Sequence, residues 1–222
     1  MNHTDPDLPN SALVSMDVQR DFALPGSPAE MPGTIDVLPS MARLVEAFRA
    51  TGRPIVHIVR LYLSDGSNVD LCRRESIQGG KEIVRPGSAG AQLVQELLPA
   101  PDTELNCAHL LAGGIQTLGP NEVVIYKPRW GAFFGTPLHD HLDGLRVNTL
   151  VVCGCNFPNC PRTTIYEASE RDFRIILVED AVSGLYPQGK QELLNIGVHI
   201  WSTEMLINRL NTEPSVPRGG NR

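Results

Sequence analysis

The chain has 222 residues, a formal net charge of −6 and 41% hydrophobic residues. Its length predicts one large domain or two small ones, and its apolar content is sufficient for a sizeable core. An acidic chain without a cluster of Lys and Arg is not expected to bind nucleic acid. Its apolar runs are far shorter than the ~20 residues of a membrane-spanning helix, so we expect no membrane partner either.

Six short apolar runs predict β-strands. Most of them are apolar at consecutive positions, which is typical of strands that are buried on both faces of a parallel sheet. The predicted strands cover residues 11–17, 53–63, 122–127, 148–154, 173–180 and 198–201.

Helical patterns lie between these runs. In the first of them Met41, Leu44, Val45 and Phe48 recur at helical spacing. The alternation of strands and helices predicts one α/β domain, in which a parallel sheet is covered by helices on both faces. The predicted helices cover residues 36–51, 89–98, 136–145, 161–172, 189–197 and 203–211.

The ends of the chain and two internal stretches do not fit this alternation. We predict a flexible segment at 1–10, the domain at 11–211 and a disordered tail at 212–222. The stretch 62–88 is polar, Gly-rich and long for a simple connection, so it is either a functional loop or a mobile one. The mixed stretch 104–118 could form a subunit interface or lie inside the domain.

The cysteines do not form a recognisable disulfide or zinc pattern. There are five of them, an odd number without the density of a disulfide framework. Cys153 and Cys155 form C-x-C rather than a zinc-finger pair, so we expect no structural zinc site. Residues 1–10 are polar and lack the apolar core of a signal peptide, and we therefore expect a cytoplasmic protein.

Three chemically active side chains follow predicted strands. Asp17 ends the first strand, Lys127 ends the strand 122–127, and Cys160 precedes Pro161 at the predicted start of a helix. Ligands bind beyond the carboxyl ends of parallel strands, so these residues are candidates for one site. A helix N-terminus and a nearby Lys favour a thiolate, which predicts a lowered pKa for Cys160. Taken singly, the three could also be a helix cap, a surface lysine and an inert buried thiol.

Three segments resemble the motifs of the isochorismatase-like cysteine hydrolases. They are SALVSMDVQRDF (11–22), KPRWGAFFGTPL (127–138) and the stretch 149–184, which contains CGCNFPNCPRTT. The segments stand in the order expected for the family and span nearly the whole chain. The family includes nicotinamidases, N-carbamoylsarcosine amidases, biuret-type hydrolases and isochorismatases.

The resemblance implies a catalytic triad of Asp17, Lys127 and Cys160 in a three-layer α/β fold, on a mostly parallel six-stranded sheet with a Rossmann-like strand order. It also implies a non-prolyl cis peptide bond between Cys155 and Asn156. The backbone N–H groups of Asn156 and Cys160 would then form an oxyanion hole. Members of the family are commonly dimers or tetramers, so we expect a homo-dimer or homo-tetramer.

The implied activity is hydrolysis of a C–N bond in a small amide, carbamoyl or ureide substrate, through a thioester on Cys160 and without a cofactor. Nicotinamidases carry metal ligands in a D-x-H motif after the second strand. This chain has the sequence HIVRLY at 57–62 instead, so we expect no metal site. An enol-ether hydrolase of the isochorismatase type and a non-catalytic family member remain as alternatives, and the presence of Cys160 favours C–N cleavage.

Aromatic residues beside the motifs are candidates for the walls of the substrate pocket. Phe22, Trp130 and Phe133 flank the segments that carry the triad. Packing in the core would explain Phe133 equally well. Gln19 lies two residues after Asp17 and is expected to support that segment at the pocket.

Three arginines are candidates to bind the substrate. Arg60 stands at the end of the second predicted strand, and Arg73 and Arg74 lie in the long stretch that follows it. A substrate carboxylate or ureido oxygen would accept hydrogen bonds from their guanidinium groups. The alternative is that these arginines only form a solvated basic surface.

Overall fold

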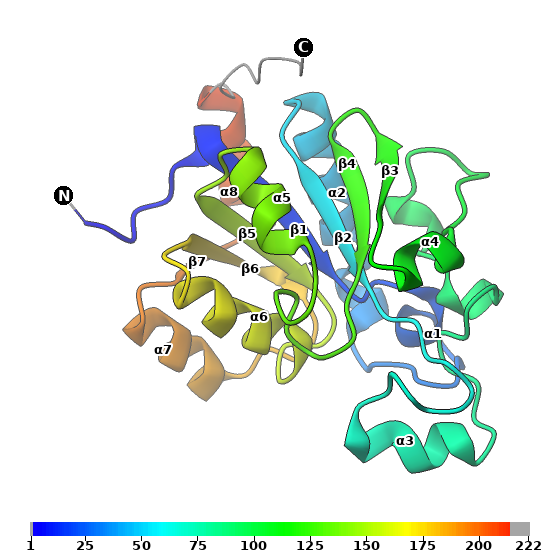
Figure 1. Ribbon diagram of the computed structural model, residues 1–222. Helices are drawn as coiled ribbons and strands as arrows, with labels where there is room; N and C mark the ends of the chain where they lie inside the picture. Colours follow the sequence, from blue (N-terminus) through cyan, green and yellow to red (C-terminus); the bar gives the residue numbers. More distant parts are fainter. Residues whose placement is uncertain (1, 214–222) are drawn as a thin grey trace.

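The computed structural model describes residues 2–213, which build a seven-stranded sheet between helices (Figure 1). The strand order is β3-β4-β2-β1-β5-β6-β7. Neighbouring strands are parallel, except that β3 is antiparallel to β4. The strands are β1 (Ser11–Met16), β2 (Ile55–Val59), β3 (Ile115–Gly119), β4 (Glu122–Tyr126), β5 (Thr149–Gly154), β6 (Arg174–Val182) and β7 (His199–Trp201).

The six predicted strands are all present, and the three-layer α/β architecture is confirmed. The sequence analysis missed β3, the antiparallel edge strand, which lies largely within the stretch 104–118. Its residues are half-buried or exposed, so it lacks the continuous apolar run that marks the central strands.

Two helical layers cover the sheet (Figure 1). One face carries α5 (Leu138–Gly144), α6 (Cys160–Ser169) and α7 (Pro187–Asn195), and the other carries α2 (Thr34–Ala50) and α8 (Thr203–Thr212). Each face has its own apolar core, because the strands alternate their side chains between the two layers. No helix among residues 2–213 is long and apolar enough to cross a membrane.

The predicted helix at 89–98 is wrong. The segment forms two short 3-10 turns, Ala89–Ala91 and Gln95–Leu97, and its backbone pairs with the loop after β1. The N–H of Arg20 donates to the carbonyl of Gln92, and the N–H of Val94 donates to the carbonyl of Val18. These long-range bonds take up backbone groups that a helix would have used internally.

Two stretches predicted to be irregular contain short helices. The stretch 62–88 holds α3 (Leu71–Gln78), and apolar residues on both sides of α3, such as Val69 and Ile83, are buried in a third core. The segment predicted to be flexible at 1–10 ends in a 3-10 turn, Leu8–Asn10, whose Leu8 is buried against the sheet. The turn is held because burial of Leu8 offsets the entropy of ordering it.

Residues 214–222, which make up most of the predicted tail 212–222, lie outside the described residues. Two further helices, α1 (Arg20–Ala23) and α4 (Cys107–Leu111), complete the elements that the structure describes.

A chain of polar groups lies between the sheet and α2. The Oγ atom of Ser15 is 2.7 Å from Nδ1 of His57, and Nε2 of His57 is 2.9 Å from Oε1 of Glu122. Arg49 of α2 donates two hydrogen bonds to the same carboxylate, at 2.6 and 2.7 Å. Burial acts to raise the pKa of Glu122, but the hydrogen bonds and charges of Arg49 and His57 outweigh it and lower the pKa to about 2.

The strand order reverses between the central strands β1 and β5, which is where open α/β sheets bind ligands. The two strands come very close at their carboxyl ends. Gly154 has a φ of +117°, and a Cβ atom there would lie 2.3 Å from the carbonyl oxygen of Met16. Only glycine allows this approach, which brings the loop after β5 against the loop after β1.

Candidate active site

Asp17, Lys127 and Cys160 meet at the carboxyl end of the sheet. Asp17 follows β1, Lys127 follows β4, and Cys160 is the first residue of α6. The Nζ atom of Lys127 lies 2.9 Å from Oδ2 of Asp17, and both side chains are buried. Because β1, β2 and β4 run parallel, residues that are 110 positions apart in the sequence reach the same edge of the sheet.

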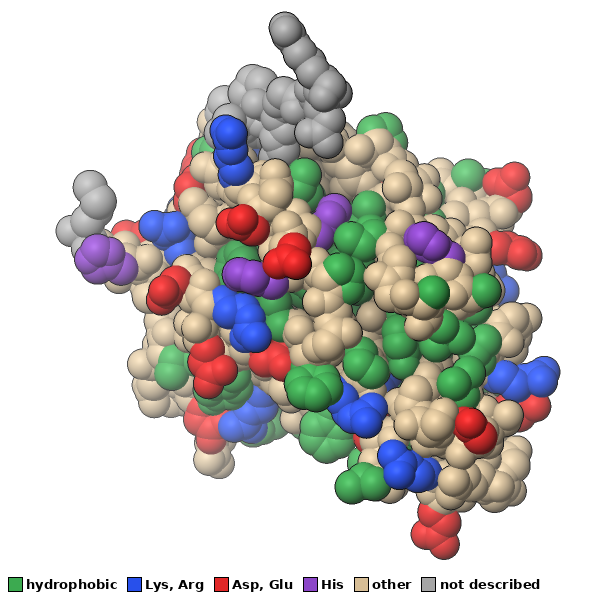
Figure 2. Space-filling model, viewed as in Figure 1, with side chains coloured by type: hydrophobic (Ala, Val, Ile, Leu, Met, Phe, Trp, Pro, Cys, Tyr) green, Lys and Arg blue, Asp and Glu red, His purple; other side chains and the backbone are tan. Residues whose placement is uncertain are grey.

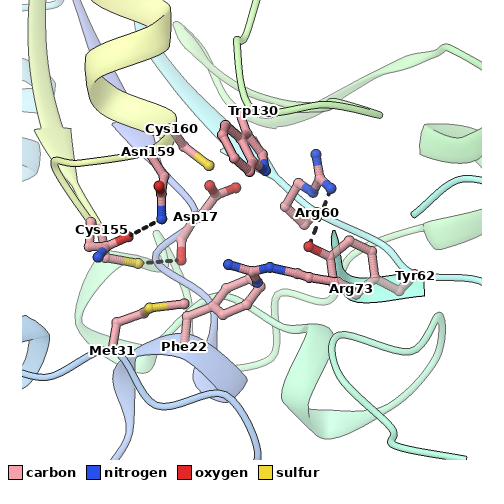
Figure 3. Close-up of a pocket in the computed structure, with 11 residues that line it drawn as sticks. Asp17, Phe22, Met31, Arg60, Tyr62, Arg73, Trp130, Cys155, Asn159 and Cys160 are labelled. Carbon is pink, nitrogen blue, oxygen red and sulfur yellow. Dashed lines mark hydrogen bonds between the residues drawn. The ribbon is translucent and has the colours of Figure 1, made fainter. Parts of the chain in front are cut away.

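The second carboxylate oxygen of Asp17 is free. Within residues 2–213, Oδ1 of Asp17 is buried and has no hydrogen-bond partner. The carboxylate and the sulfur of Cys160 point toward one another (Figure 3). Asp17 is therefore held by Lys127 through one oxygen and presents the other to the thiol, as a base that accepts a proton would.

The predicted low pKa of Cys160 is wrong in direction. Burial raises the pKa of the Cys160 thiol to about 12, and the negative charge of Asp17 acts in the same direction. The positive charges of Lys127 and Arg60 lower it by less. Lys127 already forms an ion pair with Asp17, so its charge is largely cancelled at the sulfur. The resting state therefore holds a neutral thiol beside a carboxylate–ammonium pair.

This protonation state predicts slow alkylation of Cys160 at neutral pH. Iodoacetamide is expected to modify the exposed Cys72 first, because its thiol is accessible, whereas Cys160 is a buried thiol whose pKa is about 12. Labelling of Cys160 in a Cys72→Ser protein should accelerate about tenfold for each pH unit between about pH 7 and pH 9. Peptide mass spectrometry gives the rate at each cysteine. A Cys160 rate that is already constant across this range would contradict the raised pKa.

The loop after β5 and the start of α6 carry the backbone groups expected to form the oxyanion hole. The peptide bond between Cys155 and Asn156 is cis, in agreement with the expectation. The N–H of Cys155 donates to the carbonyl of Met16 at 2.9 Å, and its thiol donates to the carbonyl of Asp17 at 3.0 Å. The N–H groups of Asn156 and Cys160 donate no hydrogen bond within residues 2–213.

A cavity opens beside the thiol. Of the residues predicted for the pocket, Phe22, Trp130 and Arg60 line it, and Arg73 lines it as well. The space-filling view shows apolar and basic side chains next to each other on this side of the molecule, between α6 and α3 (Figure 2). The sequence analysis missed several lining residues as parts of the pocket, all of them in loops: Met31, Tyr62, Cys155 and Asn159.

Gln19 is not a wall of the cavity. Its side chain is fully buried and clamps the backbone of Arg60: its Nε2 donates to the carbonyl of Arg60 at 2.8 Å, and its Oε1 accepts from the N–H of Arg60 at 2.7 Å. Gln19 therefore supports the backbone at the end of β2, where Arg60 begins the loop. An amide side chain suits this position because it pairs with both backbone groups at once.

Phe133 and Arg74 also lie outside the cavity lining. Phe133 packs in the core on the α5–α6 face, with its ring 5.7 Å from that of Phe173. Arg74 donates to the carbonyl of Val69 at 3.3 Å. Phe133 is therefore a core residue and not a wall of the pocket, because the chain turns after Trp130 and directs the ring of Phe133 inward.

His57 and the acidic residues do not gather into a metal site. Within residues 2–213, no three His, Cys, Asp or Glu side chains are grouped so that they could hold a metal ion. His57, the first residue of the stretch compared with the nicotinamidase motif, is fully buried between Ser15 and Glu122 on the α2 side of the sheet.

Comparisons with known proteins show which family the chain resembles. Residues 11–106 and 111–201 match the Isochorismatase domain. The chain is 30% identical over 207 residues to a probable inactive nicotinamidase from Arabidopsis thaliana, covering 88% of this chain and 96% of that protein. It is 27% identical to the N-carbamoylsarcosine amidase of Arthrobacter sp, covering 91% and 72%.

The fold is also that of a solved structure. An isochorismatase family protein from Desulfovibrio vulgaris has a TM-score of 0.77 and 30% sequence identity, with 91% of this chain and 98% of that chain covered. The domain match spans most of the chain, and it includes Asp17, Lys127 and Cys160. The chain belongs to the isochorismatase family of hydrolases.

Proposed function

We propose that this protein is a cysteine hydrolase that cleaves a C–N bond of a small amide, carbamoyl or ureide substrate through a thioester on Cys160. The observation that carries the proposal is the free Oδ1 oxygen of Asp17, buried at the cavity beside a thiol whose pKa is raised to about 12. A thiol in that state needs a base in order to react at neutral pH, and Asp17 is placed to be that base.

The reaction begins when Oδ1 of Asp17 accepts the thiol proton and the sulfur attacks the carbonyl carbon of the substrate. Lys127 stabilises the charges on Asp17 and the sulfur during this step. The carbonyl oxygen gains the negative charge and accepts hydrogen bonds from the N–H groups of Asn156 and Cys160, which have no other acceptor within residues 2–213. Each donor of this kind typically contributes ~2.7–4 kcal/mol to transition-state stabilisation.

Collapse of the tetrahedral intermediate breaks the C–N bond. Protonated Asp17 gives its proton to the leaving nitrogen, which departs as an amine or ammonia, and the acyl group stays on Cys160 as a thioester. Asp17 then takes a proton from a water molecule that attacks the thioester. The acid product and the free thiol are released, so atoms and charges balance over the cycle.

Two named relatives support this class of substrate. They are the N-carbamoylsarcosine amidase of Arthrobacter sp and a ureidoacrylate amidohydrolase from Methylobacterium radiotolerans, 26% identical over 194 residues. The Arabidopsis relative, by contrast, is named as probably inactive. The present chain retains Asp17 in an ion pair with Lys127, and Asp17 and Cys160 line the same cavity, which favours an active hydrolase over a non-catalytic family member.

Trapping the acyl group tests the proposal. A panel of ureides, carbamoyl amino acids and aromatic amides is turned over, quenched in acid within seconds and analysed by peptide mass spectrometry. We expect the mass of the acyl group on the peptide that contains Cys160. The Cys160→Ala protein should be inactive, whereas Cys72→Ala, the same change at an exposed thiol, should keep full activity. Full activity of Cys160→Ala would overturn the thioester mechanism.

A further inference from the structure

Two arginines face the cavity in addition to the catalytic groups. Arg60 follows β2 and is only 2% exposed, and Arg73 projects from the first turn of α3. Figure 3 shows both side chains at the side of the cavity across from Cys160. They therefore lie where the part of a substrate that does not react would be placed.

The guanidinium group of Arg60 has unused hydrogen-bonding capacity. Its Nη2 atom is bonded to the carboxylate of Asp70 and, at 3.2 Å, to the hydroxyl of Tyr62. Its Nη1 atom is buried and has no partner within residues 2–213. A buried donor without an acceptor is unfavourable, so an acceptor on a ligand would be bound with little competition from the protein.

The charges around the cavity do not cancel. Asp17 is paired with Lys127, and Asp70 is paired with Arg60. The guanidinium group of Arg73 has no ion-pair or hydrogen-bond partner among the residues that the structure describes. One positive charge therefore remains, and a substrate with one negative charge would make the filled cavity neutral.

Arg60 and Arg73 are also held in fixed relative positions. Gln19 bonds both backbone groups of Arg60, and the ion pair between Arg60 and Asp70 joins the end of β2 to the start of α3. The N–H of Arg73 donates to the carbonyl of Asp70 at 2.9 Å. A site whose groups are positioned before the ligand arrives loses less entropy on binding.

We propose that Arg60 and Arg73 form a carboxylate-binding site, and that the substrate is an amide, carbamoyl or ureide compound that also carries a carboxylate. This inference rests on the proposed function for the identity of the reacting group. A planar carboxylate fits the fork of donors on a guanidinium group, and both arginines line the cavity beside Cys160. The ligand is thus recognised at one end by the two arginines and attacked at the other by Cys160.

Matched substrates test the inference. N-carbamoylglycine, succinamic acid and 4-carbamoylbenzoic acid are each compared with their methyl ester, which keeps the reacting group and removes the charge. Wild-type protein should prefer at least one acid over its ester by about tenfold or more in kcat/KM. Arg73→Gln should lower kcat/KM for that acid roughly 10- to 100-fold, mainly by raising KM. For the ester, kcat/KM of the variant should stay within about twofold of the wild-type value.

Arg74→Gln is the matched control, because it makes the same change of charge in the same helix at a side chain that does not line the cavity. Arg74→Gln should leave kcat/KM for the acid and for its ester unchanged. If esters and acids are used equally, or if Arg74→Gln has the same effect as Arg73→Gln, the carboxylate site is overturned while the C–N hydrolase stands.

Binding measured without turnover separates the two proposals. Calorimetry on the Cys160→Ala protein should show an acid binding more tightly than its ester, and Arg73→Gln should remove the difference. Tight binding of the acid without hydrolysis by the wild type would overturn the proposed function and support the carboxylate site. Equal or absent binding of every acid–ester pair would overturn the site itself.

Discussion

Asp17→Asn is expected to lower kcat/KM at neutral pH by at least about 10³-fold, within the range that general bases contribute. The thiol of Cys160, with a pKa of about 12, is a thiolate in only about one molecule in 10⁵ at pH 7, so attack without a base is rare. Asparagine keeps an acceptor for Lys127 but cannot take the proton. Steady-state kinetics on the best substrate of the panel measures the loss.

The pH profile distinguishes loss of the base from loss of the fold. The residual rate of Asp17→Asn should rise about tenfold per pH unit from pH 7 upward, because hydroxide then supplies the thiolate that Asp17 no longer generates. Asp21→Asn makes the same isosteric change four residues later, at a carboxylate that bonds the N–H of Val84, and should keep the wild-type profile. An Asp17→Asn enzyme within tenfold of wild type would exclude Asp17 as the base.

Glu122→Ala is expected to destabilise the fold by about 3–5 kcal/mol at pH 7, the typical consequence of removing one partner of a buried ion pair. The carboxylate of Glu122 bonds both Arg49 and His57 beneath the sheet, and its loss leaves these groups without their acceptor. Glu192→Ala is the matched control. It removes a half-exposed partner of Arg162 and should change the free energy of unfolding by less than about 1 kcal/mol.

The effect of Glu122→Ala should depend on pH in one direction. The folded-state pKa of Glu122 is depressed to about 2, so its stabilisation is complete above the ordinary pKa of about 4.5 and is lost as the pH falls toward 2. The difference between wild type and Glu122→Ala in urea unfolding should therefore shrink as the pH is lowered from about 5 to about 2. A difference that is constant over that range would show that the carboxylate charge is not responsible.

Continuous apolar runs were sufficient to predict the central strands, because a strand buried on both faces has little room for polar residues. The edge strand β3 was missed since it is half-exposed and mixed in composition. The segment 89–98 has helical spacing, but its backbone bonds the loop after β1, and spacing carries no information about distant partners. The sequence pattern thus predicts strands that are buried along their whole length, and it does not predict elements that are partly exposed or held by distant partners.

At the site, too, local pattern predicts some features, whereas others depend on tertiary packing. Asp17, Lys127 and Cys160 each stand just after a strand or at the start of a helix, so the topology of a parallel sheet predicts that they come together. The side chains around them depend on where a loop turns. Phe133 faces the core and Gln19 faces the backbone of Arg60, although both lie close to triad residues in sequence. The raised pKa of Cys160 was missed because burial depends on tertiary packing.

The projecting position of α3 at one end of the sheet has an evolutionary consequence (Figure 1). The groups proposed for bond cleavage follow β1 and β4 or begin α6, whereas Arg73 belongs to α3. Changes in α3 and its flanking turns could therefore alter which compounds are accepted and leave the reactive centre intact. Related enzymes can therefore acquire different substrate specificities through changes in this one exposed segment.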